Sequence, residues 1–410
     1  MALLGARMHY AVPRILQAAG LLSFFHTDTC ASVGWPRALC SIWPERHRPR
    51  SIRQLAGRRP RDIPRARIRA HQWLGVEYVQ RLRRARTPEE TTAAYLWVGQ
   101  KFCRRIVASG DVEQSAAVFT FNGGGLEVLR RARDLGRRAI MEQTIAPRLI
   151  EQRLLEREFQ QFSQWQEGSL TDGLWTQFAD REEKEWRQAE RILCGSQFVV
   201  DGIREAGGPQ EKAIVVPYGV DFHRTVREPR RRSRGEPLKV LFTGEVGLRK
   251  GAHYLIEAAR SLAKDGFLFR LAGPVAFREA VTRRLPPNVT LLGVVPRGEI
   301  RACYDWADVF CLPSLCEGSA TVTYEALAMG LPVVTTPNAG SLVRDSQNGL
   351  IVEAGAAEPV ARALSRLRDE AGLYDQLAEN IFRDDKPEYT FEAYAARLLE
   401  VLAATGDERI

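Results

Sequence analysis

The second half of the chain alternates between two patterns of hydrophobic positions. Short runs of aliphatic and aromatic residues, typical of buried strands, occupy residues 239–244, 267–273, 289–295, 309–314, 331–336 and 349–353. The segments between them follow the helical period, at residues 251–264, 275–284, 297–306, 319–330 and 356–371. Because alternating strands and helices form a parallel sheet with helices on both faces, this half predicts a doubly wound α/β domain.

The first half shows a weaker version of the same alternation. Its strand candidates lie among long helical stretches, at residues 116–121, 137–144, 191–196 and 213–219. Residues 223–237 are basic, rich in turn-forming residues and without an apolar period, so they predict a linker. We therefore expect an N-terminal domain over 1–222, a C-terminal domain over 238–380, and a helical segment over 381–410 that packs back toward the N-terminal domain.

Length and composition narrow the class of protein. At 410 residues the chain exceeds one ordinary hydrophobic core, and its 45% hydrophobic and 27% charged residues are typical of a soluble globular protein. The chain contains no run of eighteen apolar residues, so the sequence predicts no membrane-spanning helix. The seven cysteines are scattered without a metal-binding spacing, which favours reduced thiols in a cytoplasmic protein.

Arginine supplies nearly all of the positive charge behind the net charge of +9. The window from Arg46 to Arg69 is unusual, because it holds ten arginines and a single acid, Asp62. A solvated loop is one interpretation; peripheral attraction to anionic lipid or to a phosphate-bearing acceptor is the other. Nucleic acid is the least favoured partner, because neither interleaved aromatic residues nor a helix-turn-helix pattern accompanies the arginines.

Glycines and cations follow the strand ends of the C-terminal half. The first strand is followed by Gly244 and then by Arg249 and Lys250, and the second strand is followed by Gly273. Ligands of open α/β sheets bind beyond the carboxyl ends of the strands, where glycines allow close approach of the backbone. A helix N-terminus with two nearby cations is a suitable site for a diphosphate. The simpler alternative is that the two basic residues are solvated on the surface and bind no ligand.

Two carboxylates, Glu317 and Glu325, stand eight positions apart in the stretch CEGSATVTYEALAMG. If a helix opens at Ser319, Glu325 shares an apolar stripe with neighbours at helical spacing and should face the core. A buried carboxylate is expensive unless it is paired or binds something. Either Glu325 has a structural partner, or it accepts hydrogen bonds from vicinal hydroxyls such as those of a ribose, with Glu317 on the sugar side of the same ligand.

These residues resemble the C-terminal domain of family 4 retaining GT-B glycosyltransferases, the glycosyl transferases group 1. The resemblance covers about residues 190–360, and the spacing of its two glutamates is specific. The matching pieces are Pro217–Asp221 at the domain crossover, Gly244, Arg249–Gly251, Gly273–Pro274, Tyr304, Ala307–Val309, Pro313–Ser314, Glu317–Gly318, Glu325–Ala326, Gly330–Val334 and Gly340. The fold implied is α/β of the GT-B class, with two Rossmann-like doubly wound domains facing across a cleft.

The resemblance also implies roles. A retaining glycosyltransferase of this family moves a sugar from a nucleotide-sugar donor on the C-terminal domain to an acceptor bound mostly by the N-terminal domain. The catalytic set that the resemblance implies is Arg249, Lys250 and Glu317. Arg249 and Lys250 would hold the diphosphate and stabilise the leaving group, and Glu317 would hold hydroxyls of the donor sugar. Glu325 would hold the ribose hydroxyls. The donor-binding set implied by the resemblance is Gly244, Gly273, Glu317, Gly318, Ser319, Ala320 and Glu325, in which residues 318–320 offer backbone N–H groups. The family needs no metal or other cofactor, and the chain contains no D-x-D motif.

The acceptor side departs from the family pattern. Many members carry a histidine after a middle strand of the N-terminal domain, where this chain has Glu142. The first glycine loop is reduced to Gly5, followed by His9, and Glu245 stands where the family often has an arginine. Asn122 and Gly123, after a predicted strand, are acceptor-side candidates together with His9 and Glu142; a simple turn is the alternative for Asn122–Gly125.

Three functions stay open from the sequence. The first is a retaining hexosyltransferase of cell-surface polysaccharide synthesis that acts on a glycan or lipid-linked acceptor. The second is a nucleotide-sugar epimerase or a polymerase with the same fold. The third is a catalytically silent GT-B scaffold that binds sugar nucleotide. The presence of all four residues Arg249, Lys250, Glu317 and Glu325 favours an enzyme.

Overall fold

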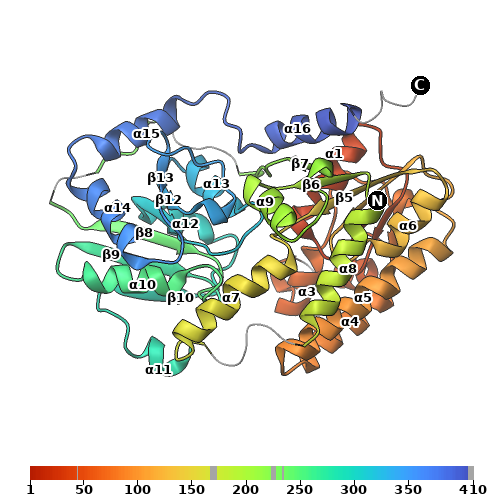
Figure 1. Cartoon of the computed structure of the whole chain (residues 1–410), viewed down its shortest axis with the longest axis horizontal. Coiled ribbons are helices and arrows are strands. Elements are labelled where there is room, and N and C mark those ends of the chain that lie inside the picture. Colours follow the sequence, from red (N-terminus) through yellow and green to blue (C-terminus); the bar gives the residue numbers. More distant parts are fainter. Residues whose placement is uncertain (44, 167–172, 223–227, 233–234, 405–410) are drawn as a thin grey trace. The chain divides into compact units, whose positions relative to one another are not determined.

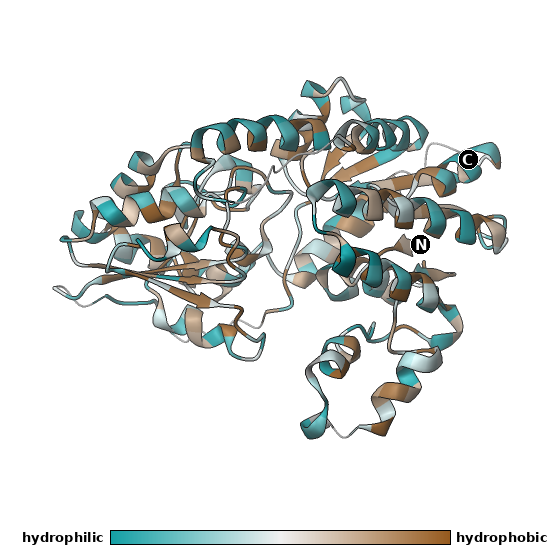
Figure 2. Cartoon of the chain, turned by 90° about the horizontal axis from the view of Figure 1, so that it is seen from below, coloured by the Kyte–Doolittle hydropathy of each residue, from teal (hydrophilic) through white to brown (hydrophobic). Residues whose placement is uncertain are grey.

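The computed structural model describes residues 1–43, 45–166, 173–222, 228–232 and 235–404, and it divides the chain into two compact units (Figure 1). Unit 1 consists of the described parts of 1–149, 171–194 and 203–214, and unit 2 of those of 150–170, 195–202 and 215–410. In each unit the strands are hydrophobic and the outer faces of the helices largely hydrophilic (Figure 2). Each unit therefore has a core of its own.

Unit 2 is built on a six-stranded parallel sheet. Its strands are β8 (Leu238–Thr243), β9 (Phe267–Ala272), β10 (Val289–Gly293), β11 (Val309–Leu312), β12 (Val333–Thr335) and β13 (Gly349–Ile351). Their spatial order is β10-β9-β8-β11-β12-β13, so the order reverses between β8 and β11. This is the doubly wound Rossmann order, and all six predicted strands are confirmed. Ligands of such sheets bind at the point of reversal, beyond the carboxyl ends of β8 and β11.

Helices connect and cover these strands. They are α10 (Ala252–Ser261), α11 (Glu279–Thr282), α12 (Ile300–Trp306), α13 (Thr321–Ala328), α14 (Ala357–Asp369), α15 (Leu373–Arg383) and α16 (Phe391–Ala404). The helix predicted over 275–284 is reduced to the four residues of α11, because Val275 forms a bridge with Val246 in extended conformation. The helix expected from Ser319 begins at Thr321 instead, because the Ala320 N–H is bonded to the carbonyl of Ala339.

Unit 1 contains seven short strands. They are β1 (Ala2–Leu3), β2 (Phe25–Thr27), β3 (Ile68–Ala70), β4 (Ala117–Phe121), β5 (Arg138–Gln143), β6 (Arg191–Cys194) and β7 (Ala213–Val215). They form two sheets, ordered β1-β2-β3 and β4-β5-β6-β7, and β1 lies beside β4. The four predicted strands are confirmed. The sequence pattern missed β2 and β3, because each is only three residues long and carries a polar residue at its centre, His26 or Arg69.

The helices of the first half are mostly amphipathic. They are α1 (Ala11–Ala18), α2 (Gly34–Ile42), α3 (Arg50–Ala56), α4 (Gln72–Arg84), α5 (Pro88–Ala108), α6 (Leu126–Asp134), α7 (Arg148–Phe162), α8 (Trp175–Gln188) and α9 (Gln197–Glu205). Most of α7 belongs to unit 2, where the buried Glu158 carboxylate is 2.9 Å from the His253 ring and accepts a hydrogen bond from Tyr254. A hydrogen-bonded buried acid of this kind fixes α7 on α10.

The described part of the predicted linker is anchored on unit 2. Residues 223–227 and 233–234 lie outside the described residues. Arg230 donates to the carbonyls of Tyr304, Ala307 and Met329 at 2.8–3.1 Å, so it ties the ends of α12 and α13 together. This basic segment therefore contributes specific contacts in addition to its charge.

The C-terminal helix α16 has contacts within unit 2. Arg397 donates to the carbonyl of Pro217 at 2.9 Å, and the rings of Tyr394 and Tyr218 meet edge to face at 5.7 Å. Both contacts hold α16 against the segment expected at the domain crossover. That the helix also packs toward the N-terminal domain stays a prediction.

Gly273 permits the close approach of two strand ends in unit 2. Its φ is +150°, and a Cβ atom there would overlap the carbonyl oxygen of Gly244. We expect Gly273→Ala to lower the free energy of unfolding by about 2 kcal/mol or more, measured by urea denaturation. Gly298→Ala is the matched control, because a Cβ there meets nothing within 4 Å. Equal denaturation midpoints for the two variants would contradict this packing role.

Candidate functional site

The loops after β8 and β11 meet at the reversal point of the unit 2 sheet. The Leu315 N–H donates to the carbonyl of Arg249 at 3.0 Å. Gly251 has a φ of +66°, and a Cβ there would overlap the carbonyl oxygen of Pro313. Only a glycine fits this crossing without strain. The sequence thus brings Arg249 and Lys250 next to the loop that carries Glu317, as the strand pattern predicts.

Arg249 and Lys250 share one carboxylate oxygen of Glu317. The distances to Oε1 are 2.9 Å from Arg249 Nη1 and 2.6 Å from Lys250 Nζ, and Arg249 also donates to the Cys316 carbonyl. These three side chains are 13–27% exposed. Burial favours the neutral acid, but the charges of Lys250 and Arg249 outweigh it and hold the pKa of Glu317 below its ordinary value. Two cations against one anion leave the cluster with a net positive charge.

Backbone N–H groups lie next to this cluster. Within the described residues, no acceptor is bonded to the backbone N–H groups of Gly318 and Ser319, and both residues are buried. They precede α13, whose first N–H groups also lack partners in the helix. Buried N–H groups are rarely left unpaired in proteins, so this segment is suited to an anion. The Ala320 N–H is different, because it donates to Ala339 and is not available in this structure.

Ser319 and Gly318 are held by further contacts. The Ser319 hydroxyl bonds to the Tyr324 hydroxyl at 2.6 Å, and the carbonyl of Gly318 accepts from the Ser196 hydroxyl at 2.6 Å. Gly340, with a φ of +60°, lies so close that a Cβ there would overlap the Gly318 carbonyl. The loop before α13 is therefore rigidly positioned.

Glu325 has a structural partner, Tyr304. The Tyr304 hydroxyl donates to Glu325 Oε2 at 2.8 Å and lies 3.3 Å from the Thr243 hydroxyl at the end of β8. The expected stripe faces the core in part: Ala326 and Met329 are buried, whereas Val322 and Glu325 are half-buried. Burial raises the pKa of Glu325, and the hydrogen bond from Tyr304 and the charge of Arg297 act against it. One carboxylate oxygen thus remains for a second donor.

The acceptor-side candidates lie in unit 1, at the ends of β4 and β5 and after β1. Asn122 donates to Glu182 at 3.0 Å and accepts from the Thr144 hydroxyl at 2.8 Å, so its side chain joins the two strand ends. Glu142 is buried in β5. His9 is exposed, with a φ of +52°, in a left-handed turn. The Asn122 N–H also donates to the carbonyl of Glu142 at 3.0 Å, so these two candidates lie together at the ends of neighbouring strands.

Gly123 belongs to a loop that binds a carboxylate of the protein itself. Glu185 Oε2 accepts from the Gly123 N–H at 2.6 Å, and Oε1 accepts from the N–H groups of Gly125 and Leu126 at 2.9 and 3.1 Å. Arg181 lies 3.7 Å from the same carboxylate. The glycine loop and the start of α6 therefore bind an anion, as such loops do, but the anion is a side chain of α8.

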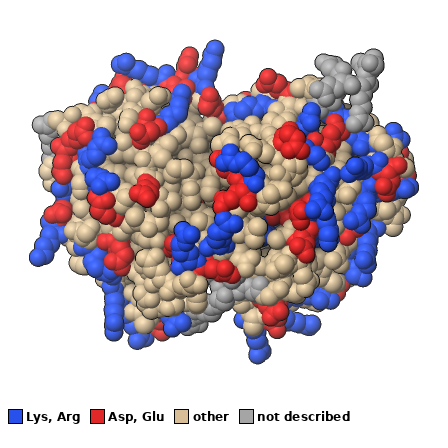
Figure 3. Space-filling view, viewed as in Figure 1, with Lys and Arg blue, Asp and Glu red and all other residues tan. Residues whose placement is uncertain are grey.

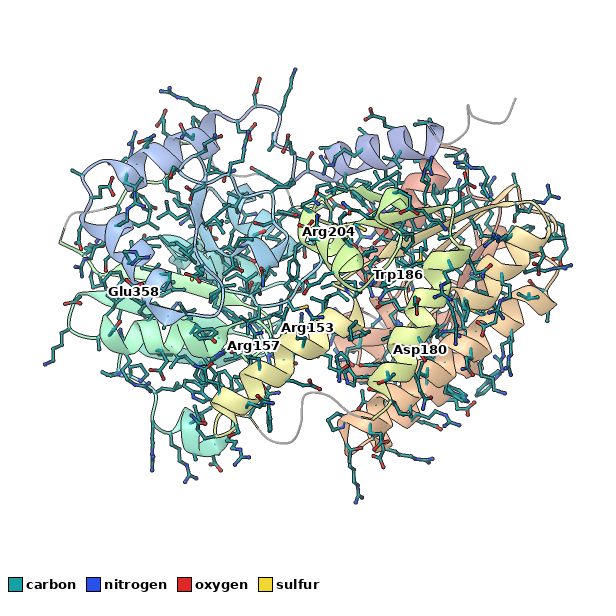
Figure 4. The ribbon with its side chains drawn as sticks, in the orientation of Figure 1. Arg153, Arg157, Asp180, Trp186, Arg204 and Glu358 are labelled. Carbon is teal, nitrogen blue, oxygen red and sulfur yellow. The ribbon has the colours of Figure 1, made fainter. Side chains whose placement is uncertain are left out.

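Sequence reasoning missed the acids and the tryptophan of α8. Glu182 accepts from Gln143 and from the Arg148 N–H, and Trp186, labelled in Figure 4, donates to Gln143 at 2.9 Å. The available signal was the spacing of Glu182, Glu185 and Trp186, which places all three on one face of a helix. Among the described residues, no group of three or more His, Cys, Asp or Glu is arranged to hold a metal ion.

The C-terminal unit matches a known family. Residues 237–370 match the family described as glycosyl transferases group 1. Among curated relatives, the putative colanic acid biosynthesis glycosyltransferase WcaL of Salmonella typhimurium is 32% identical over 199 residues, 44% of this chain and 48% of the relative. The lipopolysaccharide core biosynthesis glycosyltransferase LpsE of Rhizobium meliloti is 28% identical over 229 residues, 53% of this chain and 66% of the relative. The match thus spans about half the length of the first relative.

Solved structures resemble nearly the whole chain. Anabaena HepE, in complex with UDP and glucose, gives a TM-score of 0.60 at 16% identity and covers 98% of both chains. Sucrose-phosphate synthase from Thermosynechococcus elongatus gives 0.65 at 17% identity, over 97% of this chain and 92% of that one. These similarities establish the fold. The chain thus has the GT-B class of fold with two Rossmann-like units, and residues 237–370 within it match the glycosyl transferases group 1.

Proposed function

We propose that this chain is a retaining glycosyltransferase of cell-surface polysaccharide synthesis, which moves a hexose from a nucleotide-diphosphate-sugar donor to a glycan or lipid-linked acceptor. The observation that carries the proposal is the cluster of Arg249, Lys250 and Glu317 beside the unpaired N–H groups of Gly318 and Ser319. The names of the relatives support the biosynthetic role, since WcaL is a colanic acid and LpsE a lipopolysaccharide core glycosyltransferase. HepE, which shares the fold, binds UDP and glucose.

The donor would lie along the carboxyl edge of the unit 2 sheet. Arg249, Lys250 and the N–H groups of Gly318 and Ser319 would bind the diphosphate. Glu325, with one oxygen bonded to Tyr304, would accept hydrogen bonds from the ribose hydroxyls with the other. Gly244 and Gly273 would let the backbone approach the donor, and Glu317 would bind hydroxyls of the transferred sugar. The order of these groups matches the donor: one carboxylate for the ribose hydroxyls, two cations for the diphosphate, and a second carboxylate for the hydroxyls of the sugar.

The chemistry assigned to the site is stabilisation of a leaving group. As the bond from the anomeric carbon to the diphosphate oxygen breaks, negative charge grows on the departing diphosphate, and fixed cations stabilise that charge most in the transition state. Lys250 and Arg249 already hold an anionic oxygen, that of Glu317, at 2.6 and 2.9 Å. A diphosphate oxygen would share these donors. His9, Asn122, Gly123 and Glu142 stay candidates for the acceptor side in unit 1.

The proposal is tested by following donor breakdown. The full chain is incubated with UDP-, GDP- and ADP-sugars, with and without glycan acceptors, and release of the nucleoside diphosphate is measured. Release that an acceptor accelerates supports a transferase, and the anomeric configuration of the product, read by NMR, decides retention. Conversion of the sugar with its nucleotide still attached would identify an epimerase. Tight nucleotide binding without turnover of any donor would identify a silent scaffold.

Glu325→Ala tests the ribose contact separately. We expect it to weaken nucleoside diphosphate binding about tenfold to a hundredfold, because hydrogen bonds to a charged group contribute about 1.5–3 kcal/mol. Isothermal titration calorimetry gives the affinity, and thermal unfolding gives the stability. Glu358→Ala is the control, since Glu358, labelled in Figure 4, is an exposed acid of α14 that pairs with the exposed Arg362. A collapse of the melting temperature with unchanged affinity would leave Glu325 with a structural role alone.

A further inference from the structure

Helix α2 turns its large apolar residues outward. Trp35, Leu39 and Ile42 lie on one stripe at i, i+4 and i+7; Ile42 is 70% exposed, Trp35 is 38% exposed and Leu39 is half-buried. The helix is buried on a neighbouring side, where Pro36 and Cys40 lie, whereas Arg37 and Ser41 are exposed. A surface helix normally has the reverse arrangement, with its apolar stripe on the core. The outward stripe of α2 therefore indicates an interaction surface.

Two further tryptophans extend this stripe. Trp43 follows α2 and is 41% exposed, and Trp73 at the start of α4 is 72% exposed. The Trp35 and Trp73 rings lie 6.0 Å apart, although 38 positions separate them in the chain. Among the tryptophans of the described residues, Trp35, Trp43 and Trp73 are the exposed ones. We call Trp35, Ile42, Trp43 and Trp73 the apolar patch.

The structure divides the arginines of the 46–69 window into two groups. Several are bound internally: Arg58 pairs with Asp28 at 2.9 Å, and Arg48 donates to the carbonyls of Cys40 and Trp43. The exposed group is Arg46, Arg53, Arg59, Arg61 and Arg65.

Two of the exposed arginines lie near the apolar patch. Arg46 comes three residues after Trp43, and Arg53 belongs to α3, which packs on α2. The face drawn in Figure 3 shows basic and acidic side chains interspersed, so the argument depends on this local group and not on the overall charge.

Tryptophans, an isoleucine and arginines together have the chemistry of the membrane interface. Indole rings prefer the headgroup level of a bilayer, and arginines near an apolar stripe are attracted to anionic headgroups. A short helix with an outward apolar stripe suits insertion in the plane of the interface. None of the described helices is long and apolar enough to cross a bilayer. A nucleic acid or protein partner would not account for an aliphatic and aromatic stripe bordered by arginines as directly.

We infer that the apolar patch, with Arg46 and Arg53, docks unit 1 on a bilayer that contains anionic lipid. Trp73 lies only three residues beyond the end of β3, so the docked surface adjoins the carboxyl edge of the β1-β2-β3 sheet. The use of the surface depends on the proposed function, because a lipid-linked acceptor presents its sugars at such an interface. The docking itself does not depend on that function and is measured without donor or acceptor.

Vesicle sedimentation tests the docking. The full chain is mixed with vesicles of phosphatidylcholine alone or with a third of phosphatidylglycerol, at low and at high salt. We expect sedimentation with the anionic vesicles, at least tenfold weaker with the neutral ones and reduced by salt, together with a blue shift of tryptophan fluorescence. Absence of sedimentation with anionic vesicles at low salt would overturn the inference, and so would equal sedimentation with both kinds of vesicle.

Matched variants locate the surface. Ile42→Ser with Trp73→Ala should lower binding to anionic vesicles tenfold or more, and Arg46→Ala with Arg53→Ala should lower it and remove most of its salt dependence. Val294→Ser and Arg283→Ala are the controls, since both side chains are exposed in unit 2. All six side chains are exposed, so melting temperatures should not change. Undiminished vesicle binding by the patch variants would overturn the assignment. It would also be overturned if the wild type bound no vesicles and the patch variants instead had a raised KM for a soluble glycan.

The outcome is distinguishable from that of the proposed function. Nucleoside diphosphate affinity is measured on the same variants, and the patch variants should keep it, because the donor residues lie in unit 2. Loss of vesicle binding with intact nucleotide affinity supports the docking surface. A chain that binds vesicles as expected but neither binds nor cleaves any nucleotide sugar would refute the proposed function and leave the surface standing.

Discussion

Lys250→Ala is expected to lower turnover at saturating donor about a hundredfold or more. Its ammonium group lies 2.6 Å from the anionic oxygen of Glu317, at the position assigned to the leaving diphosphate. Removal of one preorganised donor to a developing anion typically costs about 10²–10³ in rate. Initial rates of nucleoside diphosphate release at saturating donor and acceptor measure the loss, and KM for the donor should change less than kcat.

Two comparisons make this result decisive. Lys264→Ala removes an exposed lysine of the same unit and should leave the rate unchanged. Thermal unfolding with and without nucleotide shows whether the Lys250 variant keeps its fold, which we expect because Arg249 still pairs with Glu317 at 2.9 Å. A folded Lys250 variant with the normal rate would place the diphosphate elsewhere and refute the assigned role.

Glu185→Ala is expected to lower the free energy of unfolding by about 3–5 kcal/mol. The substitution removes the acceptor of three buried N–H groups and leaves Arg181 without one of its carboxylate neighbours, and a buried charged group deprived of its partner is strongly destabilising. Urea denaturation followed by circular dichroism measures the change. Glu183→Ala is the control on the same helix, because the Glu183 side chain is 43% exposed and pairs with the exposed Arg187; it should change stability by less than about 0.5 kcal/mol.

The same carboxyl group makes stability depend on pH. Burial raises the pKa of Glu185 from 4.5 to about 7, against the charge of Arg181 and the N–H groups of the glycine loop. Between these values the unfolded chain has released a proton that the folded chain keeps. The stabilisation linked to this proton is therefore complete below the unfolded pKa and is lost as the pH rises toward 7. Glu185→Gln should lack this slope, and an identical pH profile for wild type and variant would contradict the raised pKa.

The sheet of unit 2 was predictable because its strands are buried on both faces. Parallel strands such as β8 and β11 read as unbroken apolar runs, and the glycines and cations that follow them mark their carboxyl ends. The loop residues Arg249, Lys250 and Glu317 could be assigned to one edge for the same reason. Their pairing could not, because it depends on the crossing of two loops at Gly251, which tertiary contacts determine.

The acceptor side was harder to predict because polar residues there serve internal roles. Asn122 reads as a turn or ligand residue, yet its side chain is bonded to Glu182 and Thr144. The acids of α8 read as a solvated helix face, since nothing local indicates that Glu182 and Glu185 point at a glycine loop some sixty positions away. The partner of Glu325 could not be predicted either. Tyr304 matches the family pattern, but its hydrogen bond to Glu325 joins two helices and depends on how they pack.

Arg230 gives the basic segment of unit 2 that the sequence predicts as a linker a consequence for protein engineering. Its guanidinium binds carbonyls of Tyr304 and Met329, at the ends of the helices that carry the Tyr304–Glu325 pair. A chimaera joined through this segment with a neutral spacer would lose Arg230 and its hydrogen bonds to α12 and α13. The ends of α12 and α13 would then be free, and we expect the hybrid to bind its nucleotide more weakly although every donor residue is present. The crossover of such a hybrid should be placed on the N-terminal side of Arg230.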